Sequence, residues 1–330
     1  MKALLSRAPG GPETLSLEDV PAPPVAAGEV RVTVRACSVN FPDLLVIQDL
    51  YQFKPPRPFA PGSEVAGIVE SVGEGVTHVT SGDRVLLGPI QNGMAELAVG
   101  PARACWKIPA SMPFEEAAAL LMTYGTSYHA LKDRAALKRG ETLLVLGAGG
   151  GVGSAAVELG VALGARVIAA ASSEAKLAFA REHGAADGVL YPRGALDREA
   201  ARALTDRFKA ACGGGADVIY DPIGGDYSEA ALRAINWRGR HLVVGFTAGI
   251  PKLPLNLPLL KDCDVRGVFW GEFMRREPER HIANTQELLA LYEAGRIRPA
   301  VTERFPLARG AEAIARLKDR AVQGKVVVMP

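Results

Sequence analysis

The chain has 330 residues, of which 48% are hydrophobic and 22% are charged. This length predicts two domains, because a single hydrophobic core rarely grows beyond about 250–300 residues. The composition excludes an intrinsically disordered chain, and a net charge of +2 without a block of lysine or arginine argues against a nucleic-acid partner. No apolar run could span a bilayer, and the N-terminus lacks the apolar core of a signal peptide. We therefore expect a cytoplasmic protein that does not bind a membrane.

The first third of the chain has the pattern of short β-strands. Residues 29–36 alternate between valine and other residues, and residues 65–72 and 83–87 are apolar runs bounded by glycine. The segments between them are rich in proline and are predicted to be irregular loops.

From about residue 113 the pattern changes to helix, and from residue 141 strands and helices alternate. Strands are predicted at 142–146, 166–170, 188–191, 216–221, 240–246 and 265–269, with helices at 154–163, 174–183, 196–211 and 227–235. Strands this apolar, separated by helices, predict a doubly wound parallel sheet covered on both faces. The proline-rich connection 249–260 is too broken for a regular crossover helix.

After residue 270 this alternation ends. A helix over 278–294, a strand over 301–305, a helix over 308–320 and a closing strand over 325–329 are predicted. The closing strand suggests that the chain returns to its first domain. We therefore expect one domain of residues 1–122 and 271–330, and a second of residues 123–270.

A glycine-rich turn follows the strand 142–146. It consists of Gly147, Ala148, Gly149, Gly150, Gly151, Val152 and Gly153, an A-x-G-x-x-G pattern with alanine in the first glycine position. Residues without side chains let the backbone approach a pyrophosphate, and free amides at the helix start point at the anion. A tight turn without a ligand is the alternative, but the strand–turn–helix setting favours a dinucleotide cofactor.

The glycine turn and two further motifs carry a family resemblance. The motifs are Tyr124-Gly125-Thr126 before a helix and Pro61-Gly62-Ser63-Glu64 before Val65-Ala66-Gly67. With them the chain resembles the medium-chain dehydrogenase/reductase superfamily, and within it the zinc-free quinone oxidoreductase branch to which zeta-crystallin belongs. The resemblance implies an α/β protein with a GroES-like β-barrel catalytic domain, interrupted by a Rossmann domain, and an active site in the cleft between them.

The resemblance also bears on metal binding. Zinc members of the superfamily carry a G-H-E motif whose histidine binds the metal, whereas this chain has Gly62-Ser63-Glu64. Catalytic zinc needs three protein ligands, and at best Cys37 and Glu64 are available, so no metal is expected. The cysteines Cys37, Cys105, Cys212 and Cys263 are far apart, which also argues against a structural zinc lobe and a disulfide scaffold. Without a Lewis acid, conjugated acceptors are favoured, since hydride arrival leaves a delocalised anion.

On the catalytic side the resemblance points to Asn40 and Tyr51. The Asn40 amide could hydrogen-bond the substrate oxygen or the nicotinamide ribose, or it could bond its own backbone before Pro42. Tyr51 resembles a residue that lines the substrate mouth, and a packed surface tyrosine is the alternative. Asp43 is expected to be a buried structural residue. Related enoyl-thioester reductases have a proton-donating tyrosine where Asn40 stands.

On the nucleotide side the resemblance implies that Thr126, Gly245 and Phe246 contact the nicotinamide end of the cofactor. For Gly245 and Phe246 a simple strand end is the alternative. The loop 221–225 resembles the family's nicotinamide-ribose loop, and a plain turn is the alternative.

The cofactor is predicted to be NADPH rather than NADH. An NAD site has an acidic side chain at the end of the second strand, but here the strand ends in Ser172 and Ser173. Lys176 can supply a positive charge, and Tyr191 and Arg320 match family positions that contact the 2′-phosphate. The alternatives are Ser172 as a helix cap, Lys176 and Arg320 as solvated charges, and Tyr191 as packing.

The sequence thus predicts an NADPH-dependent reductase of a small-molecule quinone or other conjugated carbonyl. An enoyl-CoA or enoyl-thioester reductase is one alternative, and a non-catalytic, crystallin-like structural or RNA-binding protein is another. The intact glycine turn argues against the non-catalytic alternative. A homodimer is expected through the strand 265–269, because an apolar strand at a sheet edge invites pairing and the superfamily joins two sheets there.

Overall fold

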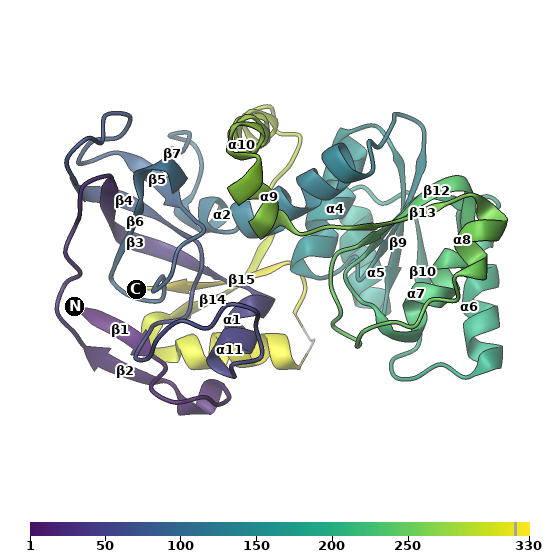
Figure 1. The fold of residues 1–330 in the computed structure, drawn as a ribbon, viewed down its shortest axis with the longest axis horizontal. Coiled ribbons are helices and arrows are strands. Elements are labelled where there is room, and N and C mark those ends of the chain that lie inside the picture. Colours follow the sequence, from purple (N-terminus) through teal and green to yellow (C-terminus); the bar gives the residue numbers. More distant parts are fainter. Residues whose placement is uncertain (320–321) are drawn as a thin grey trace. The chain divides into compact units, whose positions relative to one another are not determined.

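The computed structural model describes residues 1–319 and 322–330, and the chain divides into two compact units (Figure 1). Unit 1 consists of Met1–Met122 and Pro299–Pro330, and unit 2 consists of Thr123–Arg298. Among the described residues no helix is both long and apolar enough to cross a membrane.

Unit 1 is built around a seven-stranded sheet. Its strands are β3 (Glu29–Val39), β4 (Val65–Val72), β5 (Arg84–Leu87), β6 (Leu97–Pro101), β7 (Cys105–Lys107), β14 (Val301–Pro306) and β15 (Lys325–Met329). They follow the order β14-β15-β3-β4-β5-β7, with β6 also paired to β3. A separate antiparallel pair is formed by β1 (Lys2–Leu5) and β2 (Ser16–Asp19). Alternate valines of β3 are buried, because successive side chains of a strand point to opposite faces.

Strand β3 continues to Val39, beyond the predicted end at residue 36, because it pairs with the last strand of the chain. The two strands are antiparallel, with Val326 opposite Val39 and Val328 opposite Cys37. Helices α1 (Phe41–Ile47), α2 (Phe114–Ala118) and α11 (Gly310–Lys318) complete the unit. Helix α1 begins directly where β3 ends, so its first residues lie beside the start of β15.

Unit 2 has a six-stranded sheet in the order β10-β9-β8-β11-β12-β13, in which all neighbours are parallel. Its strands are β8 (Thr142–Leu146), β9 (Arg166–Ala171), β10 (Asp187–Leu190), β11 (Ala216–Asp221), β12 (Ile235–Val243) and β13 (Asp264–Gly267). The crossovers contain α4 (Gly151–Ala162), α5 (Glu174–Glu182), α6 (Arg198–Ala211), α7 (Gly225–Leu232) and α8 (Asn256–Lys261). This order is that of a doubly wound nucleotide-binding fold, as predicted.

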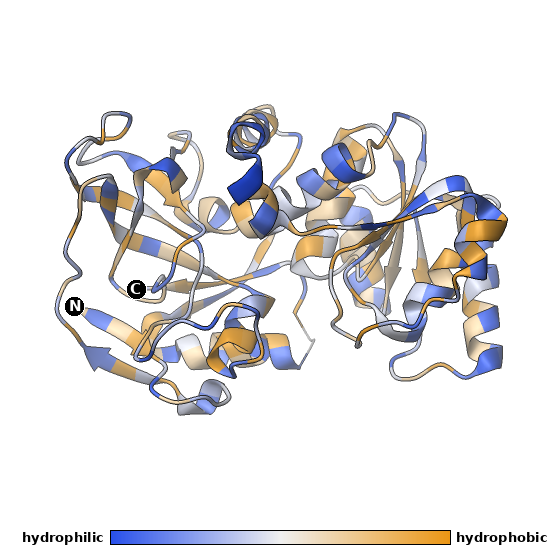
Figure 2. Ribbon diagram, in the orientation of Figure 1, coloured by the Kyte–Doolittle hydropathy of each residue, from blue (hydrophilic) through white to orange (hydrophobic). Residues whose placement is uncertain are grey.

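The central strands of unit 2 are buried on both faces. Four consecutive residues of β8, Leu143 to Leu146, are each 0% exposed. Figure 2 shows the strands of both units rich in hydrophobic residues. Such continuous apolar runs are what a parallel sheet covered by helices requires.

Two elements of unit 2 differ from the prediction. Strand β12 begins at Ile235 rather than residue 240, and a register irregularity opposite β11 together with the positive φ of Arg238 interrupts the side-chain alternation there. The connection predicted to be too broken for a regular crossover helix contains the short helix α8. Pro258 is tolerated in it because the first turn of a helix has no intrahelical partner for its N–H groups.

The predicted assignment of residues 271–298 to the first domain was wrong. Helices α9 (Trp270–Arg276) and α10 (Pro278–Glu293) belong to unit 2. Asn284 of α10 donates a hydrogen bond of 2.7 Å to Asp133, and Tyr128 donates one of 2.5 Å to Glu287. These side-chain contacts bind α10 to the helical segment that opens unit 2, and no local sequence pattern reveals them.

Candidate functional site

The glycine-rich turn of unit 2 connects β8 to α4, as predicted. Gly147 has φ +63°, and a Cβ added to Gly153 would lie 2.1 Å from the Gly147 carbonyl oxygen, so both positions require glycine. A Cβ added to Gly150, at the N-cap of the 12-residue helix α4, would meet only that oxygen, at 3.6 Å. The first N–H groups of α4 have no partner within the helix. The turn therefore fits a dinucleotide pyrophosphate.

Lys176, one of the residues expected at the 2′-phosphate, lies beside this turn. A Cβ added to Gly149 would come within 2.7 Å of the Lys176 side chain, so Lys176 packs against the turn. Ser173, rather than Ser172, caps α5, since its hydroxyl accepts a hydrogen bond from the Lys176 N–H at 3.3 Å. Burial, and secondly the positive charge of Arg193, lower the pKa of Lys176. Arg193 was not predicted, because its proximity to Lys176 depends on the pairing of β9 with β10.

Two other residues, Tyr191 and Arg320, were also expected to contact the phosphate. Tyr191 follows β10 and is only 8% exposed, with its ring 5.0 Å from that of Tyr227. Burial, followed by Tyr227 and Asp221, raises the pKa of Tyr191 to about 12. Much of the Tyr191 side chain is therefore packed against neighbouring residues, which was the alternative interpretation. Arg320 lies outside the described residues.

Asp221 organises the loop after β11. One carboxylate oxygen accepts the N–H groups of Ile223 and Gly224, each at 2.9 Å. The other oxygen accepts the hydroxyl of Ser228 and lies 3.1 Å from Nε2 of His241. Gly224 has φ +74°, and a Cβ there would lie 2.4 Å from the carbonyl oxygen of residue 249, so the loop needs glycine at this position.

Asp221 also holds the loop after β12. Its backbone carbonyl accepts the N–H groups of Val244 at 2.9 Å and Gly245 at 3.3 Å. The predicted nicotinamide residues Gly245 and Phe246 are therefore placed by the same aspartate, and Phe246 is 47% exposed. The joining of the two loops by Asp221 was not predicted, because no local sequence pattern connects them.

Thr126 begins the short helix α3 (Thr126–Tyr128) in unit 2. The next residue, Ser127, contacts the Tyr220 hydroxyl at 2.8 Å and donates to the Val152 carbonyl at 3.1 Å. These contacts hold the start of α3 near both β11 and the glycine turn, and the contact of Thr126 with the nicotinamide end stays a prediction.

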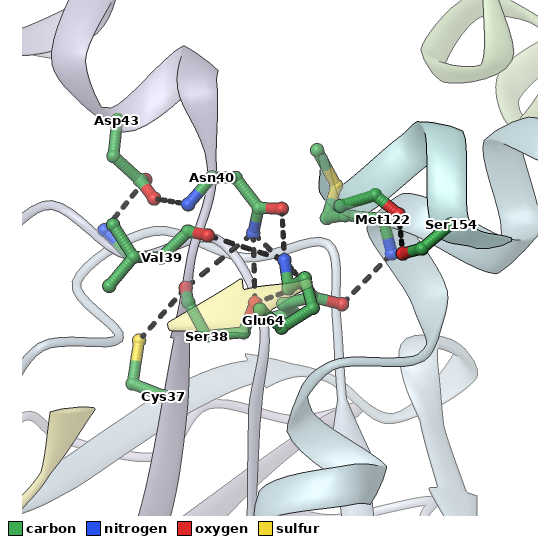
Figure 3. A network of polar contacts seen from close by, with 11 residues as sticks. Cys37, Ser38, Val39, Asn40, Asp43, Glu64, Met122 and Ser154 are labelled. Atoms are coloured by element: carbon green, nitrogen blue, oxygen red, sulfur yellow. Dashed lines mark hydrogen bonds and ion pairs between the residues drawn. The ribbon is translucent and has the colours of Figure 1, made fainter. Parts of the chain in front are cut away.

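In unit 1, Asn40 belongs to a buried polar cluster (Figure 3). Its Nδ2 donates to Oε1 of Glu64 at 3.0 Å, and its Oδ1 accepts from Nζ of Lys325 at 2.7 Å. Ser38 donates to the same Glu64 oxygen at 2.8 Å, and the backbone N–H of Met122 donates to the other at 2.9 Å. Lys325 was not predicted here, because only the pairing of β15 with β3 brings it to Asn40.

Asp43, in the first turn of α1, holds the backbone around this cluster. It accepts the N–H groups of Asn40 at 2.7 Å and Gly62 at 3.0 Å, which agrees with its predicted structural role. Burial raises the pKa of Asp43 to about 6. Burial and the charge of Asp43 raise the pKa of Tyr51, which is partly buried, so its phenol stays protonated at neutral pH.

Comparisons with known proteins agree with this geometry. One family model, described as an alcohol dehydrogenase GroES-like domain, matches residues 26–119, and another, described as a zinc-binding dehydrogenase, matches residues 151–287. A quinone oxidoreductase-like protein 2 homolog of Nematostella vectensis is 39% identical over 308 residues, covering 92% of this chain and 82% of that protein. The chain belongs to the medium-chain dehydrogenase/reductase superfamily, in its quinone oxidoreductase branch.

Other members of the branch extend the likeness over the whole chain. Quinone oxidoreductase-like protein 2 of Bos taurus is 38% identical and covers 95% of this chain and 88% of its own. The crystal structure of Escherichia coli quinone oxidoreductase complexed with NADPH has a TM-score of 0.90 at 29% identity, and the match covers 100% of both chains. The protein is therefore an oxidoreductase, and the predicted GroES-like and Rossmann architecture is confirmed.

One family model is described as zinc-binding, but Cys37, Ser63 and Glu64 of this chain do not fit a zinc ion. Burial raises the pKa of the Cys37 thiol well above its ordinary range, whereas zinc binds thiolate. Glu64 is already paired with Lys325, and Ser63 occupies the position of the superfamily's histidine ligand. Within residues 1–319 and 322–330, no three His, Cys, Asp or Glu side chains form a group that could hold a metal.

We predict that Asp221→Asn destabilises the protein in a pH-dependent way. Burial alone would raise the pKa of Asp221, but hydrogen bonding and charge from His241, with hydrogen bonds from Ser228 and Gly224, hold that pKa below its ordinary value. Such a carboxylate stabilises the fold above its unfolded-state pKa of about 4, and the contribution disappears as the pH falls through the lower folded-state pKa. At neutral pH we expect a loss of about 3–5 kcal/mol in the free energy of unfolding.

Denaturant unfolding of the variant and the unmodified protein at several pH values checks this prediction. The difference should shrink toward low pH, and Asp206→Asn, on the exposed face of α6, should change little. A difference that does not vary with pH would show that the carboxylate charge is unimportant.

Proposed function

We propose that the protein transfers hydride from NADPH to a quinone or another conjugated carbonyl. The observation that carries this proposal is the glycine turn at the start of α4, with Lys176 packed against it and serines, not an acid, at the end of β9. The similarity to Escherichia coli quinone oxidoreductase, which was solved with NADPH, supports the choice of cofactor and acceptor.

The cofactor would be held by unit 2. The residues of the glycine turn, Gly147 to Gly153, would bind the pyrophosphate, while Ser172, Ser173, Lys176 and Tyr191 would surround the 2′-phosphate. Thr126, Gly245 and Phe246 would contact the nicotinamide end, with the two loops kept in place by Asp221. When bound, NADPH supplies the hydride.

The acceptor would be oriented by Asn40 and Tyr51 of unit 1. Hydride transfer to a carbonyl places negative charge on oxygen, which a positioned N–H or O–H donor stabilises. A quinone or enone spreads that charge through conjugation, so hydrogen bonds suffice where a simple ketone would need a Lewis acid. The unpartnered Ser63 hydroxyl, buried in the segment next to Glu64, is compatible with a polar ligand here.

The direct test is a screen of purified protein with NADPH and equal concentrations of quinones, simple enones and enoyl-CoA thioesters. Oxidation of NADPH, followed by its absorbance, should be fastest with a quinone or an enone. Preference for enoyl-CoA would replace the proposed acceptor class, and NADPH that is bound but not oxidised by any of them would favour a non-catalytic role.

We further predict that NADPH is preferred over NADH and that Lys176→Ala weakens this preference. A hydrogen bond to a charged group contributes about 1.5–3 kcal/mol, so the KM for NADPH should rise by about 10-fold to 100-fold while that for NADH changes little. Lys138→Ala, an exposed lysine of unit 2, is the matched control. Equal efficiency of the unmodified enzyme with both cofactors would contradict the assignment.

We also propose a homodimer formed through β13, the edge strand of the unit 2 sheet. Val265 is 41% exposed and Phe269, just after the strand, is 60% exposed. The segment before β13 exposes further large apolar side chains: Ile250 80%, Leu255 80%, Leu259 79% and Leu260 68%. Apolar patches beside an open sheet edge are typical of a subunit interface. The cytoplasmic location remains a prediction from composition.

Light scattering should therefore give twice the chain mass of 34.8 kDa. Leu259→Glu should shift the protein toward the monomer, because it places a charge in the apolar interface, whereas Leu50→Glu, at a 68% exposed leucine of unit 1, should not. A monomeric mass for the unmodified protein at micromolar concentration would rule out the dimer.

A further inference from the structure

Unit 1 contains a buried lysine that the proposed reaction does not yet use. Lys325 is the first residue of β15 and is 4% exposed. Because Val326 lies opposite Val39 in the antiparallel pair, Lys325 faces the point where β3 ends and α1 begins. That point is Asn40, the residue proposed to orient the acceptor.

The Lys325 ammonium group is fully occupied by neighbours in the protein. An ammonium has three N–H donors. Nζ lies 2.7 Å from Oδ1 of Asn40, 3.2 Å from the Val39 carbonyl and 3.5 Å from Oε1 of Glu64. Burial lowers the pKa of Lys325, and the charges of Glu64 and Asp43 oppose this shift. With all its donors used internally, Lys325 can act on a ligand only through another residue.

That residue is Asn40. Since Oδ1 accepts from the lysine, the amide is oriented with Nδ2 toward Glu64, to which it donates at 3.0 Å. The remaining contacts of Nδ2, with Ser38, are longer, at 3.3 and 3.5 Å. One N–H of the amide therefore lacks a short hydrogen bond within the cluster. A charged donor on Oδ1 polarises the amide and strengthens Nδ2 as a donor.

Glu64 depends on the same lysine. It is 2% exposed, and among residues 1–319 and 322–330 the donors to its carboxylate other than Lys325 are neutral groups of Ser38, Asn40 and Met122. A carboxylate buried without a counter-charge is strongly unfavourable. Without Lys325, the buried Glu64 carboxylate would lack its charged partner, and Asn40 would lose the donor that orients its amide.

We propose that Lys325 is a positioning residue for the acceptor: as the built-in cation of this cluster it neutralises Glu64 and orients Asn40 so that the amide presents an N–H to the acceptor's oxygen. This inference rests on the proposed function. It gives the C-terminal strand a role in turnover.

The test is a double-mutant cycle on Lys325→Met and Asn40→Ala, with the acceptor that the unmodified enzyme uses best. Lys325→Met should lower kcat about 10-fold or more, less than the roughly 100-fold to 1000-fold for outright loss of a positioned donor, and leave the KM for NADPH unchanged. Because Lys325 acts through Asn40, it should lower kcat little further in the Asn40→Ala background. Lys325→Arg should restore part of the activity, and Lys318→Met, an exposed lysine of α11, should have no effect.

A second variant keeps the test possible if the first one misfolds. If Lys325→Met alone does not fold, Lys325→Met with Glu64→Gln removes both charges of the pair, and it should bind NADPH normally but turn over slowly. Unchanged kcat in either variant, or effects of Lys325→Met and Asn40→Ala that multiply independently, would overturn the inference while leaving the proposed function standing. Absence of turnover by the unmodified protein with every acceptor would overturn both.

Discussion

The antiparallel pairing of β15 with β3 is the constraint on which unit 1 depends. It joins the last strand of the chain to one of the first, and it extends β3 to Val39, so that α1 starts beside Lys325. The buried polar cluster of Asn40, Glu64 and Lys325 exists only because of this register. A shift by one residue would move the lysine to the opposite face of the sheet, since strand side chains alternate.

Both units place a buried carboxylate where a loop must be held. In unit 1, Glu64 gathers the side chains of Ser38 and Asn40, and in unit 2, Asp221 gathers the loops that follow β11 and β12. Each carboxylate is almost fully removed from water, so each must be satisfied by several donors. Such networks specify one arrangement of the surrounding backbone, which is what positioning a cofactor or an acceptor requires.

One family model is described as zinc-binding, and the cluster in unit 1 shows why this chain needs no zinc ion there. With Ser63 in place of a histidine ligand, the buried carboxylate of Glu64 needs a cation other than a metal ion. Lys325 supplies the positive charge, and the thiol of Cys37 remains protonated because of its burial. A fixed ammonium can orient an amide, but it does not polarise a carbonyl directly, which agrees with acceptors that stabilise their own negative charge.

Local sequence patterns determined a large part of this protein. Hydrophobic periodicity located most strands and helices, the glycine turn followed from residues 147–153 alone, and the family motifs led to the correct fold and branch. The 2′-phosphate residues Ser172, Ser173 and Lys176 and the acceptor residues Asn40 and Tyr51 remain predictions. Such features are readable because each depends on the conformation of a few consecutive residues.

Long-range contacts decided the rest. Helices α9 and α10 belong to unit 2 because of side chains such as Asn284 and Asp133, which meet only in the folded protein. Arg193 lies near Lys176 through the pairing of two strands, and Lys325 reaches Asn40 across 285 residues of sequence. Asp221 likewise joins two loops that no local pattern connects. A single sequence carries no direct signal for such pairs, because burial and register, rather than spacing along the chain, bring them together.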